Sequence, residues 1–363
     1  MKNFLYLGVI GILVSSCGGA EETKPITQPT ENITTVEPTN GSTSKNTYSK
    51  DYTALNEKAR LFFGELPKNA ENPENPLTEE KVILGQTLYF DKILSKDKTQ
   101  SCNTCHNLNT YGVDNQSFSA GNDGGLGGRN SPTTLNAALH MAQFWDGREP
   151  DVEAQAGGPV LNPVEMAMAS EADVEERLSD SDKYIDLFDA AFPLDENPIS
   201  YENMKKAIGA FERMLVTPSR FDEYIAGNNN ALTDQEMQGM ETFIEVGCTT
   251  CHMGALLGGS MYQKFGVHSE YWKATKSEKV DNGRFDLTGN EADKYFFKVP
   301  SLRNIAKTNP YFHDGSIDSL EEAISIMAKV QLNKELTPEE LSNMVAFMES
   351  LTGEVEEKYR NEI

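Results

Sequence analysis

Two Cys-x-x-Cys-His motifs are the residues of this chain whose types and spacing could most directly carry chemistry. Their members are Cys102, Cys105 and His106 in the first motif and Cys248, Cys251 and His252 in the second. Two thiols at this spacing can form thioether bonds to the vinyl groups of a haem, and the histidine that follows can bind the iron from one side. The motifs therefore predict two covalently attached haems c.

The cysteine count favours haem over the two alternatives for a Cys-x-x-Cys pair, a redox disulfide and half of a zinc site. The chain has five cysteines, and Cys17 is the one that lies outside the motifs. A zinc site needs four ligands brought together. In an oxidising compartment an unused thiol pair would tend to close into a disulfide. Haem attachment is the alternative that also uses the histidine after each pair.

The first residues of the chain resemble a bacterial export signal. Lys2 supplies a positive charge, and residues 4–14 supply an apolar run that is too short to span a membrane. The run leads into Val14-Ser-Ser-Cys17, which resembles a lipoprotein cleavage box; a plain secretory signal is the alternative. We therefore expect a signal peptide over residues 1–16 and lipid on Cys17. The mature protein would be anchored to a bacterial membrane, facing the periplasm or the cell exterior.

The charge of the chain narrows the range of its partners. The formal net charge at pH 7 is −24. Such a chain would repel the phosphates of nucleic acid, so we expect no nucleic-acid partner. It would attract a cationic protein over a long range. The alternative is that the acidity serves solubility alone.

The hydrophobic pattern predicts a mainly α-helical fold with long loops and few strands. Apolar residues recur at helical spacing over Glu171–Phe192, Tyr201–Leu215, Asp234–Val246, Leu320–Lys329 and Glu339–Leu351. Capping boxes begin two of these helices, at Thr233 and at Thr337. The glycine-rich loops over residues 111–132 and 254–290 are long enough to be functional, and we expect them to cover the haem faces.

An imperfect repeat predicts two similar domains. Leu77-Thr-Glu-Glu80 and Leu232-Thr-Asp-Gln235 each open a helix that leads toward a Cys-x-x-Cys-His motif. Residues 17–50 are rich in Thr, Pro, Asn, Ser and Glu, which predicts a flexible tether ahead of both domains. We predict cytochrome c-like haem domains over residues 51–216 and 217–363.

The ligand on the second face of each iron decides what the haem can do. A filled position favours electron transfer, whereas an open position lets a small oxidant reach the iron. Methionine opposite histidine raises the potential and suits a haem that receives electrons. The candidates after His252 are Met253, Met261 and Met327, and spacing alone does not choose among them.

Over residues 77–353 the chain closely resembles the bacterial dihaem cytochrome c peroxidases, together with the related methylamine-utilisation dihaem enzymes. The segments that carry the resemblance are Ser101–Asn107, Arg129–Thr133, Gln143–Arg148, Asn162–Met166, Gly247–His252, Gly283–Phe285, Pro310–Gly315 and Ile326–Met327. The resemblance implies an enzyme that reduces hydrogen peroxide to water with electrons from a small cytochrome or similar donor.

The resemblance also implies how the two haems are bound. His106 would bind the iron of an N-terminal, peroxidatic haem. His252 and Met327 would bind the iron of a C-terminal, high-potential haem that accepts electrons from the donor. Trp145 matches the tryptophan that lies between the two haems, where it would pass electrons, although a lone tryptophan is more often a core residue.

Two polar residues would serve the peroxide chemistry. Glu165 matches the distal glutamate of the family, with Gln155 close to it. Cleavage of the peroxide bond needs a proton moved from one oxygen to the other, and a carboxylate in a mostly apolar pocket can do this. The local sequence alone would equally allow Glu165 to be a helix-start residue.

A calcium ion between the domains is also implied by the resemblance. Its ligands would be oxygens at Asn130, Thr308 and Pro310, the last two through backbone carbonyls, and such hard ligands suit Ca²⁺. Asn130 could otherwise be a plain turn residue. The resemblance further leads us to expect a homodimer.

One departure from the family pattern concerns the first haem. Many members have a histidine in the loop after the first motif, and it ligates the resting peroxidatic iron; the matching position here is Asn122. The chain has five histidines, none of them in this loop. We expect a first haem that is five-coordinate or water-ligated at rest and needs little reductive activation. His140 is the fallback ligand, with a surface or core residue as the favoured alternative, His313 is expected to be a structural hydrogen-bonding residue and His268 a loop residue.

Two other functions remain open from the sequence. A dihaem oxidase that modifies a partner protein is the first, although a tyrosine takes the methionine's place in that branch, so Met327 argues against it. A non-catalytic electron-transfer cytochrome is the second.

Overall fold

The structure is a computed structural model and describes residues 48–363. The predicted export signal, Cys17 and nearly all of the tether lie outside the described residues. Within the described part, no helix combines the length and the apolar character needed to cross a membrane.

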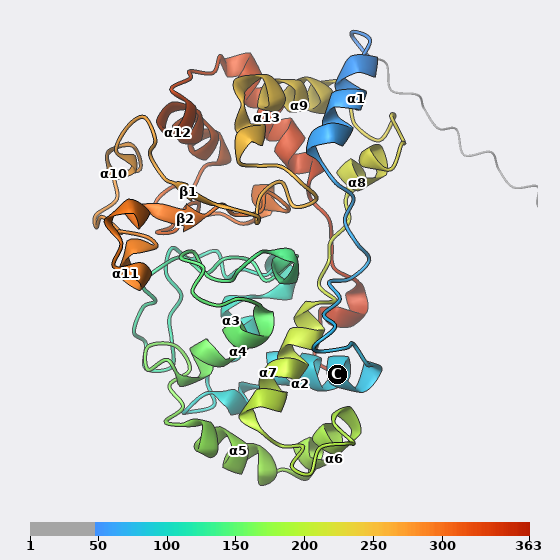
Figure 1. The fold of residues 1–363 in the computed structure, drawn as a ribbon, viewed down its shortest axis with the longest axis vertical. Helices are drawn as coiled ribbons and strands as arrows, with labels where there is room; N and C mark the ends of the chain where they lie inside the picture. The colour runs from blue at the N-terminus through green and yellow to red at the C-terminus, as the bar shows by residue number, and fades with distance from the viewer. Residues whose placement is uncertain (1–47) are drawn as a thin grey trace, which may run out of the picture. The chain divides into compact units, whose positions relative to one another are not determined.

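The described residues form a mainly α-helical fold with long loops and a single two-stranded sheet, as predicted (Figure 1). The α-helices are α1 (Thr53–Phe62), α2 (Glu79–Phe90), α3 (Cys102–Cys105), α4 (Val152–Leu161), α5 (Glu171–Ser179), α6 (Asp182–Ala191), α7 (Tyr201–Glu212), α8 (Arg220–Ile225), α9 (Asp234–Val246), α10 (Tyr271–Ala274), α11 (Phe285–Thr288), α12 (Leu320–Leu332) and α13 (Pro338–Ser350). The 3-10 helices are η1 (Lys92–Leu94), η2 (Leu108–Thr110), η3 (Ala137–Leu139), η4 (Cys248–Thr250), η5 (Glu291–Asp293), η6 (Ile305–Lys307) and η7 (Glu357–Tyr359). Strand β1 (Tyr262–Lys264) pairs antiparallel with β2 (Phe296–Lys298).

Most of the predicted helices are present, with two differences. The capping boxes at Thr233 and Thr337 are both formed. The pattern over residues 171–192 belongs to two helices, α5 and α6, which are separated at Asp180 and Ser181. Short polar side chains of this kind compete with helical hydrogen bonds and favour helix ends. The loop over residues 254–290 contains β1, α10 and α11, so it is less irregular than its composition suggests.

The two halves share one kind of helix crossing. In the first half α2 crosses α7, and in the second half α9 crosses α13. A Cβ added at Gly85 of α2 would lie 1.9 Å from the carbonyl oxygen of Ala207, and one added at Gly239 of α9 would lie 1.9 Å from the carbonyl oxygen of Asn343. Each crossing therefore needs a glycine, because any side chain would force the helices apart. This shared geometry fits two cytochrome c-like units.

A segment near each end of the chain packs into the core of the opposite half. Helix α1 packs through Leu55 and Ala59 into the core that also contains α8, α9 and α13 (Figure 1). Near the other end of the chain, Val355 and Tyr359 pack with Tyr89 of α2. The boundary between residues 216 and 217 stays a prediction, but each half is completed by a segment from outside its predicted range.

Candidate haem-binding sites

The second motif follows the end of α9. Gly247 ends this helix with a left-handed φ of 103°, a conformation that glycine adopts without strain, and the chain turns at once into Cys248. The His252 side chain is 9% exposed, and its Nδ1 lies 2.8 Å from the carbonyl oxygen of Leu257. Nδ1 therefore carries the proton, which leaves Nε2 as the ligand atom. Burial lowers the pKa of His252 and so favours this neutral form.

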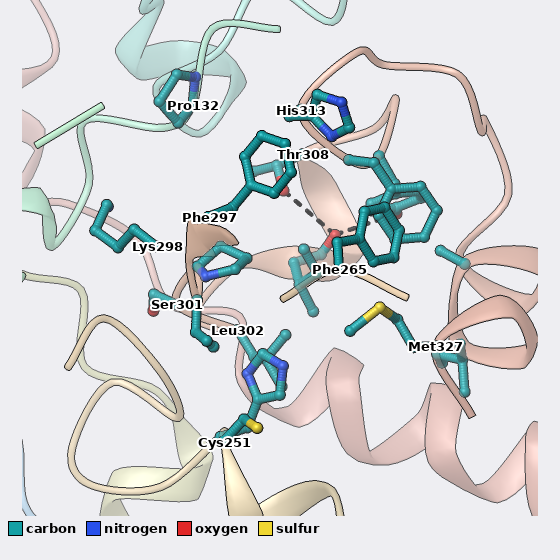
Figure 2. Close-up of a pocket in the computed structure, with 18 of the residues that line it drawn as sticks. Pro132, Cys251, Phe265, Phe297, Lys298, Ser301, Leu302, Thr308, His313 and Met327 are labelled. Atoms are coloured by element: carbon teal, nitrogen blue, oxygen red, sulfur yellow. Dashed lines mark hydrogen bonds between the residues drawn. The ribbon is translucent and has the colours of Figure 1, made fainter. Parts of the chain in front are cut away.

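A cavity of about 240 Å³ opens beside this motif. Cys248, Cys251, His252 and Met327 all line it. Figure 2 shows Cys251 at one end of the cavity and Met327 reaching into it from the side of α12. Of the three methionines left open by the sequence, Met327 is the one that lines the cavity, whereas Met253 is 41% exposed. Met344 and Met348 of α13 also line it but belong to the buried core.

The residues around the cavity fit a haem. Burial raises the pKa of the Cys248 thiol to about 12, so the thiol is protonated in this apolar cavity. The four motif cysteines form no disulfide. Within residues 48–363, no three His, Cys, Asp or Glu side chains come together as a metal cluster. An apolar cavity with two thiols, a neutral imidazole and a thioether suits covalent haem with axial ligation.

The first motif begins in α3. The Ser101 and Thr104 side chains form a capping box around its start. The Tyr89 hydroxyl donates to the His106 carbonyl oxygen at 2.6 Å and so fixes the end of the motif. The imidazole Nδ1 of His106 is buried and has no hydrogen-bond partner among the described residues. Burial lowers the pKa of His106 and raises that of the Cys102 thiol to about 12, the same pattern as in the second motif.

Glu165 lies in the turn that follows α4. Asn162 donates to its carboxylate at 2.8 Å, and the Glu165 carbonyl accepts from the Asn122 amide at 2.7 Å. Burial raises the pKa of Glu165, although Arg148 and the Asn162 hydrogen bond act against this. Burial also raises the pKa of the Cys105 thiol to about 11, and the Glu165 charge adds to that rise. The carboxyl group is therefore within electrostatic reach of the first motif.

Gln155 and Trp145 both precede this turn in sequence. Gln155 is half-buried on α4, the helix that leads into the Glu165 turn. The Trp145 indole Nε1 donates to the Asn130 carbonyl at 2.9 Å, and the Trp145 carbonyl accepts from the Lys298 amide at 2.8 Å. Trp145 thus contacts segments of both halves and lines the cavity of the second motif.

The three residues expected to bind calcium all line that same cavity. The Asn130 amide Nδ2 donates to the Gln116 carbonyl at 2.9 Å, so its Oδ1 is the atom available to a cation. Thr308 and Pro310 flank Asn309, whose carbonyl accepts from Asn115 at 2.7 Å. The ligand set itself stays a prediction.

The remaining histidines have different surroundings. His140 lies against Lys298, with 2.6 Å between its Nδ1 and the lysine Nζ, and it lines the cavity of the second motif. His313 is 2% exposed and stacks on Phe297 with ring centroids 4.4 Å apart, and its Nε2 has no partner among the described residues. Its hydrogen bond to the other half comes instead from its carbonyl, which accepts from Asn130. His268 is an exposed loop residue.

An ion-pair network between the halves was not predicted from the sequence. The Arg129 guanidinium donates to Asp281 at 2.7 and 2.9 Å and to Asp146 at 2.7 Å. Arg284 donates to the Asp146 carbonyl at 2.8 Å. Arg129, Asp146 and Arg284 lie in segments that carry the family resemblance, whereas Asp281 lies outside all of those segments. The pairing depends on the fold and has no local signal.

Comparison with known proteins agrees with this geometry. Residues 79–230 match the family model described as di-haem cytochrome c peroxidase. The cytochrome c551 peroxidase of Pseudomonas aeruginosa is 43% identical over 302 residues, 83% of this chain and 87% of the relative. The cytochrome c551 peroxidase of Nitrosomonas europaea is 45% identical over 289 residues, 79% of this chain and 84% of the relative. A solved MauG-like protein associated with microbial copper homeostasis superposes with a TM-score of 0.73 at 28% identity, covering 82% of this chain and 97% of that one.

The fold and the paired motifs define a dihaem c-type protein. With the likeness to the two peroxidases, the chain belongs to the di-haem cytochrome c peroxidase family and is an enzyme of the cytochrome c peroxidase type. Two haems are its cofactors.

Proposed function

We propose that this enzyme reduces hydrogen peroxide at the first motif with electrons that enter at the second motif from a small cytochrome or similar donor. The observation that carries the proposal is the difference between the two sites. A half-buried carboxyl group, Glu165, lies within electrostatic reach of Cys105, whereas a methionine, Met327, shares a cavity with His252. When bound, the haems supply redox-active iron at both sites.

The chain's own residues would divide the work at the first site between binding and proton transfer. His106 would hold the iron from one side. Glu165 would accept a proton from peroxide and return it to the leaving oxygen, because its raised pKa brings the carboxyl closer to neutral pH. Gln155 would orient the peroxide through its amide. Asn162 donates to the carboxylate and would fix its orientation.

At the second site His252 and Met327 would hold the iron, and Trp145 would bridge the two sites for electrons. Two hydrogen bonds support this role: the one from the indole Nε1 to the Asn130 carbonyl fixes the ring, and the one from the Lys298 amide to the Trp145 carbonyl ties its backbone to the second half. Replacement of Met327 by Ala should lower the potential of the second haem and change its oxidised spectrum. Replacement of the exposed Met253 by Ala should change neither. An unaltered spectrum in Met327→Ala would reopen the ligand assignment.

The proposed resting state of the first haem rests on Asn122, which occupies the position of the histidine that ligates the resting iron in many family members. The half-buried Asn122 side chain accepts from the Asp97 amide at 3.0 Å, so it is held by the neighbouring loop. The first haem would then be five-coordinate or water-ligated at rest, and the enzyme would turn over without prior reduction. An optical and spin-resonance spectrum of the oxidised protein tests this, because two low-spin haems would contradict it. Steady-state peroxide reduction with a reduced cytochrome, started from the oxidised enzyme, tests the function itself.

Calcium would bind between the halves at Asn130, Thr308 and Pro310. The hydrogen bond from Trp145 to the Asn130 carbonyl supports a link between this ion and the electron bridge. Titration calorimetry with Ca²⁺, with Asn130→Ala as the comparison, tests the site. A lack of heat in the wild type would remove it.

The setting of the enzyme is proposed from its sequence. Lipid on Cys17 would hold it at a bacterial membrane, facing the periplasm or the cell exterior. The net charge of −24 favours a cationic cytochrome as donor. A homodimer is the expected assembly. Metabolic labelling with a fatty acid, abolished by Cys17→Ala, tests the anchor.

The second candidate function is a dihaem oxidase that acts on a partner protein. The likeness to the MauG-like structure favours it, and so does the absence of a histidine in the Asn122 loop. Met327 opposes it. High peroxidase turnover with a cytochrome donor decides between the two.

A further inference from the structure

A buried lysine, Lys298, lines the cavity of the second motif without a carboxylate partner. It is 6% exposed and lies on β2, where it pairs across the sheet with Tyr262. It forms no ion pair within residues 48–363, and its Nζ contacts the Nδ1 of His140 at 2.6 Å. An unpaired ammonium in such a place is costly, so a binding partner outside the chain is expected.

The surroundings of Lys298 point to an anion as that partner. The cavity has no aspartate or glutamate among its lining residues and two cationic ones, Lys298 and Arg303. Arg303 uses its guanidinium on Asp222, at 2.8 Å, and on the Ala255 carbonyl. In the described part of the chain, Lys298 is therefore the cationic group of the lining without an ion-pair partner, and burial lowers its pKa to about 7, a shift that a bound anion would oppose.

His140 extends the same site. The lysine ammonium can only donate, so the His140 Nδ1 accepts its hydrogen bond and the imidazole proton is on Nε2. Burial, with Lys298 acting in the same direction, lowers the pKa of His140 and keeps this ring neutral. The Nε2 atom is buried and has no partner among the described residues. Three N–H bonds are thus left over, the two remaining on the Lys298 ammonium and the one on the His140 Nε2.

The position of Lys298 suits the carboxylate edge of a haem. A haem c carries its thioether bonds at one edge and its propionate carboxylates at the opposite edge. Figure 2 shows Cys251 at one end of the cavity, Pro132 and His313 at the other, and Lys298 at one side between these ends, away from Cys251. Lys298 and Met327 lie on opposite sides of the cavity (Figure 2), so an ammonium at Lys298 is kept away from the proposed iron ligand.

We propose that Lys298 and His140 together bind a propionate carboxylate of the second haem and set its reduction potential. The proposal rests on the haem site assigned above to His252 and Met327. A buried positive charge beside the haem stabilises the reduced form, and a charge-assisted hydrogen bond fixes the carboxylate. Lys298 is then a positioning residue and makes no contact with peroxide.

The test compares Lys298→Met with Lys298→Arg, which keeps the charge, and with Lys264→Met as a matched control. Lys264 lies on β1 of the same sheet and does not line the cavity. In Lys298→Met the reduction equilibrium of the second haem should shift at least tenfold toward the oxidised form, which is about 59 mV for one electron. The propionate bending vibration in the resonance Raman spectrum should shift as well. Lys298→Arg should restore most of the potential, and Lys264→Met should match the wild type.

An unchanged potential and vibration in a Lys298→Met protein that retains both haems would overturn the proposal. If that variant does not assemble with haem, Lys298→Gln and His140→Gln decide the question, and wild-type values of both measurements in either variant overturn it. A wrong assignment of the iron ligands would give a different result. The wild-type spectrum would then lack the features of methionine ligation, while the propionate vibration would still change when Lys298 is replaced.

Discussion

The two Cys-x-x-Cys-His sites of this enzyme are built on the same helical frame but differ in what approaches each histidine. In the second site the Leu257 carbonyl holds His252, and Met327 shares its cavity. In the first site the buried His106 ring is influenced by the backbone of Gly112 and Pro132, and the charge of Glu165 acts on Cys105. The shared helices thus position the two motifs, and residues outside them, Glu165 in a turn and Met327 on α12, distinguish the two sites.

The frames themselves are alike in a second respect. Each half contains a buried arginine that is paired with a carboxylate. Arg213 donates to Glu153 at 2.7 and 2.6 Å in the first half, and Arg303 donates to Asp222 at 2.8 Å in the second. Removal of one partner from such a pair leaves a buried charge and is strongly destabilising. The residues that distinguish the two sites, Glu165 in the turn after α4 and Met327 on α12, lie outside these buried ion pairs.

Replacement of Glu165 by Gln should have the largest effect, because it removes the group that most separates the two sites. The variant keeps the shape and the Asn162 contact but cannot accept a proton. The peroxidase kcat/KM should fall by about 10²- to 10⁴-fold. Steady-state kinetics with a reduced cytochrome donor measure this, and the oxidised spectra of both haems should not change.

Its control is Glu171→Gln, an exposed glutamate at the start of α5, which should retain wild-type activity. The pH profile gives a further check. Because burial raises the pKa of Glu165, the wild-type rate should fall as pH drops through a value above that of an ordinary glutamate. This decrease in rate at low pH should be absent from the pH profile of Glu165→Gln. Nearly full activity in this variant would assign proton transfer to another group.

Replacement of Gly85 or Gly239 by Ala tests how closely the frames match. Each new Cβ would lie 1.9 Å from a backbone oxygen of the crossing helix, so the helices must separate. We expect each variant to lose roughly 3 kcal/mol of unfolding free energy, the upper range for overpacking. Denaturant unfolding of the haem-loaded protein measures the loss.

Gly158→Ala is the matched control for both glycine variants. Gly158 is exposed within α4, where a Cβ would meet only an ordinary contact at 3.7 Å from Phe144. Alanine should stabilise the helix there by about 0.5–1 kcal/mol. If Gly85→Ala and Gly239→Ala differ widely in cost, the two crossings are not equivalent and the repeat is only approximate.

Much of this organisation could be predicted from local sequence. The predictions of a mainly helical fold and of capping boxes at Thr233 and Thr337 are confirmed, because helix caps and hydrophobic periodicity are local signals. The break at Asp180 and the exchange of chain ends were not predicted, since both depend on packing between distant segments. Likewise, nothing local distinguishes Lys298 from a surface lysine.

Replacement of Asp281 by Asn breaks the contact through which Arg129 joins the halves. Burial alone would raise the pKa of Asp281, but the Arg129 hydrogen bonds outweigh it and hold the pKa below its ordinary value. The variant should lose about 2 kcal/mol of unfolding free energy at pH 7. The contribution of this depressed carboxyl is fully present above its unfolded pKa, near 3.9, and disappears as pH falls through the folded value.

The difference between wild type and Asp281→Asn should therefore shrink below about pH 4. Asp286→Asn, an exposed neighbour on α11, should show no such loss at pH 7. A constant difference across this pH range would mean that the variant acts through packing and not through the ion pair.

Replacement of Asn122 by Ala should have the smallest effect and concerns the residue that most distinguishes the first site from its family. Its side chain accepts from the Asp97 amide at 3.0 Å and from the Thr99 hydroxyl at 3.2 Å, both at an exposed position. Loss of these bonds should cost about 1 kcal/mol, and Thr99→Val, which removes one of them, should cost less. The oxidised spectrum and the first-turnover rate should stay within twofold of the wild type, because Asn122 is held by residues 97–99 and does not serve as a ligand. A new low-spin signal or a lag before the first turnover would show that Asn122 controls access to the first iron.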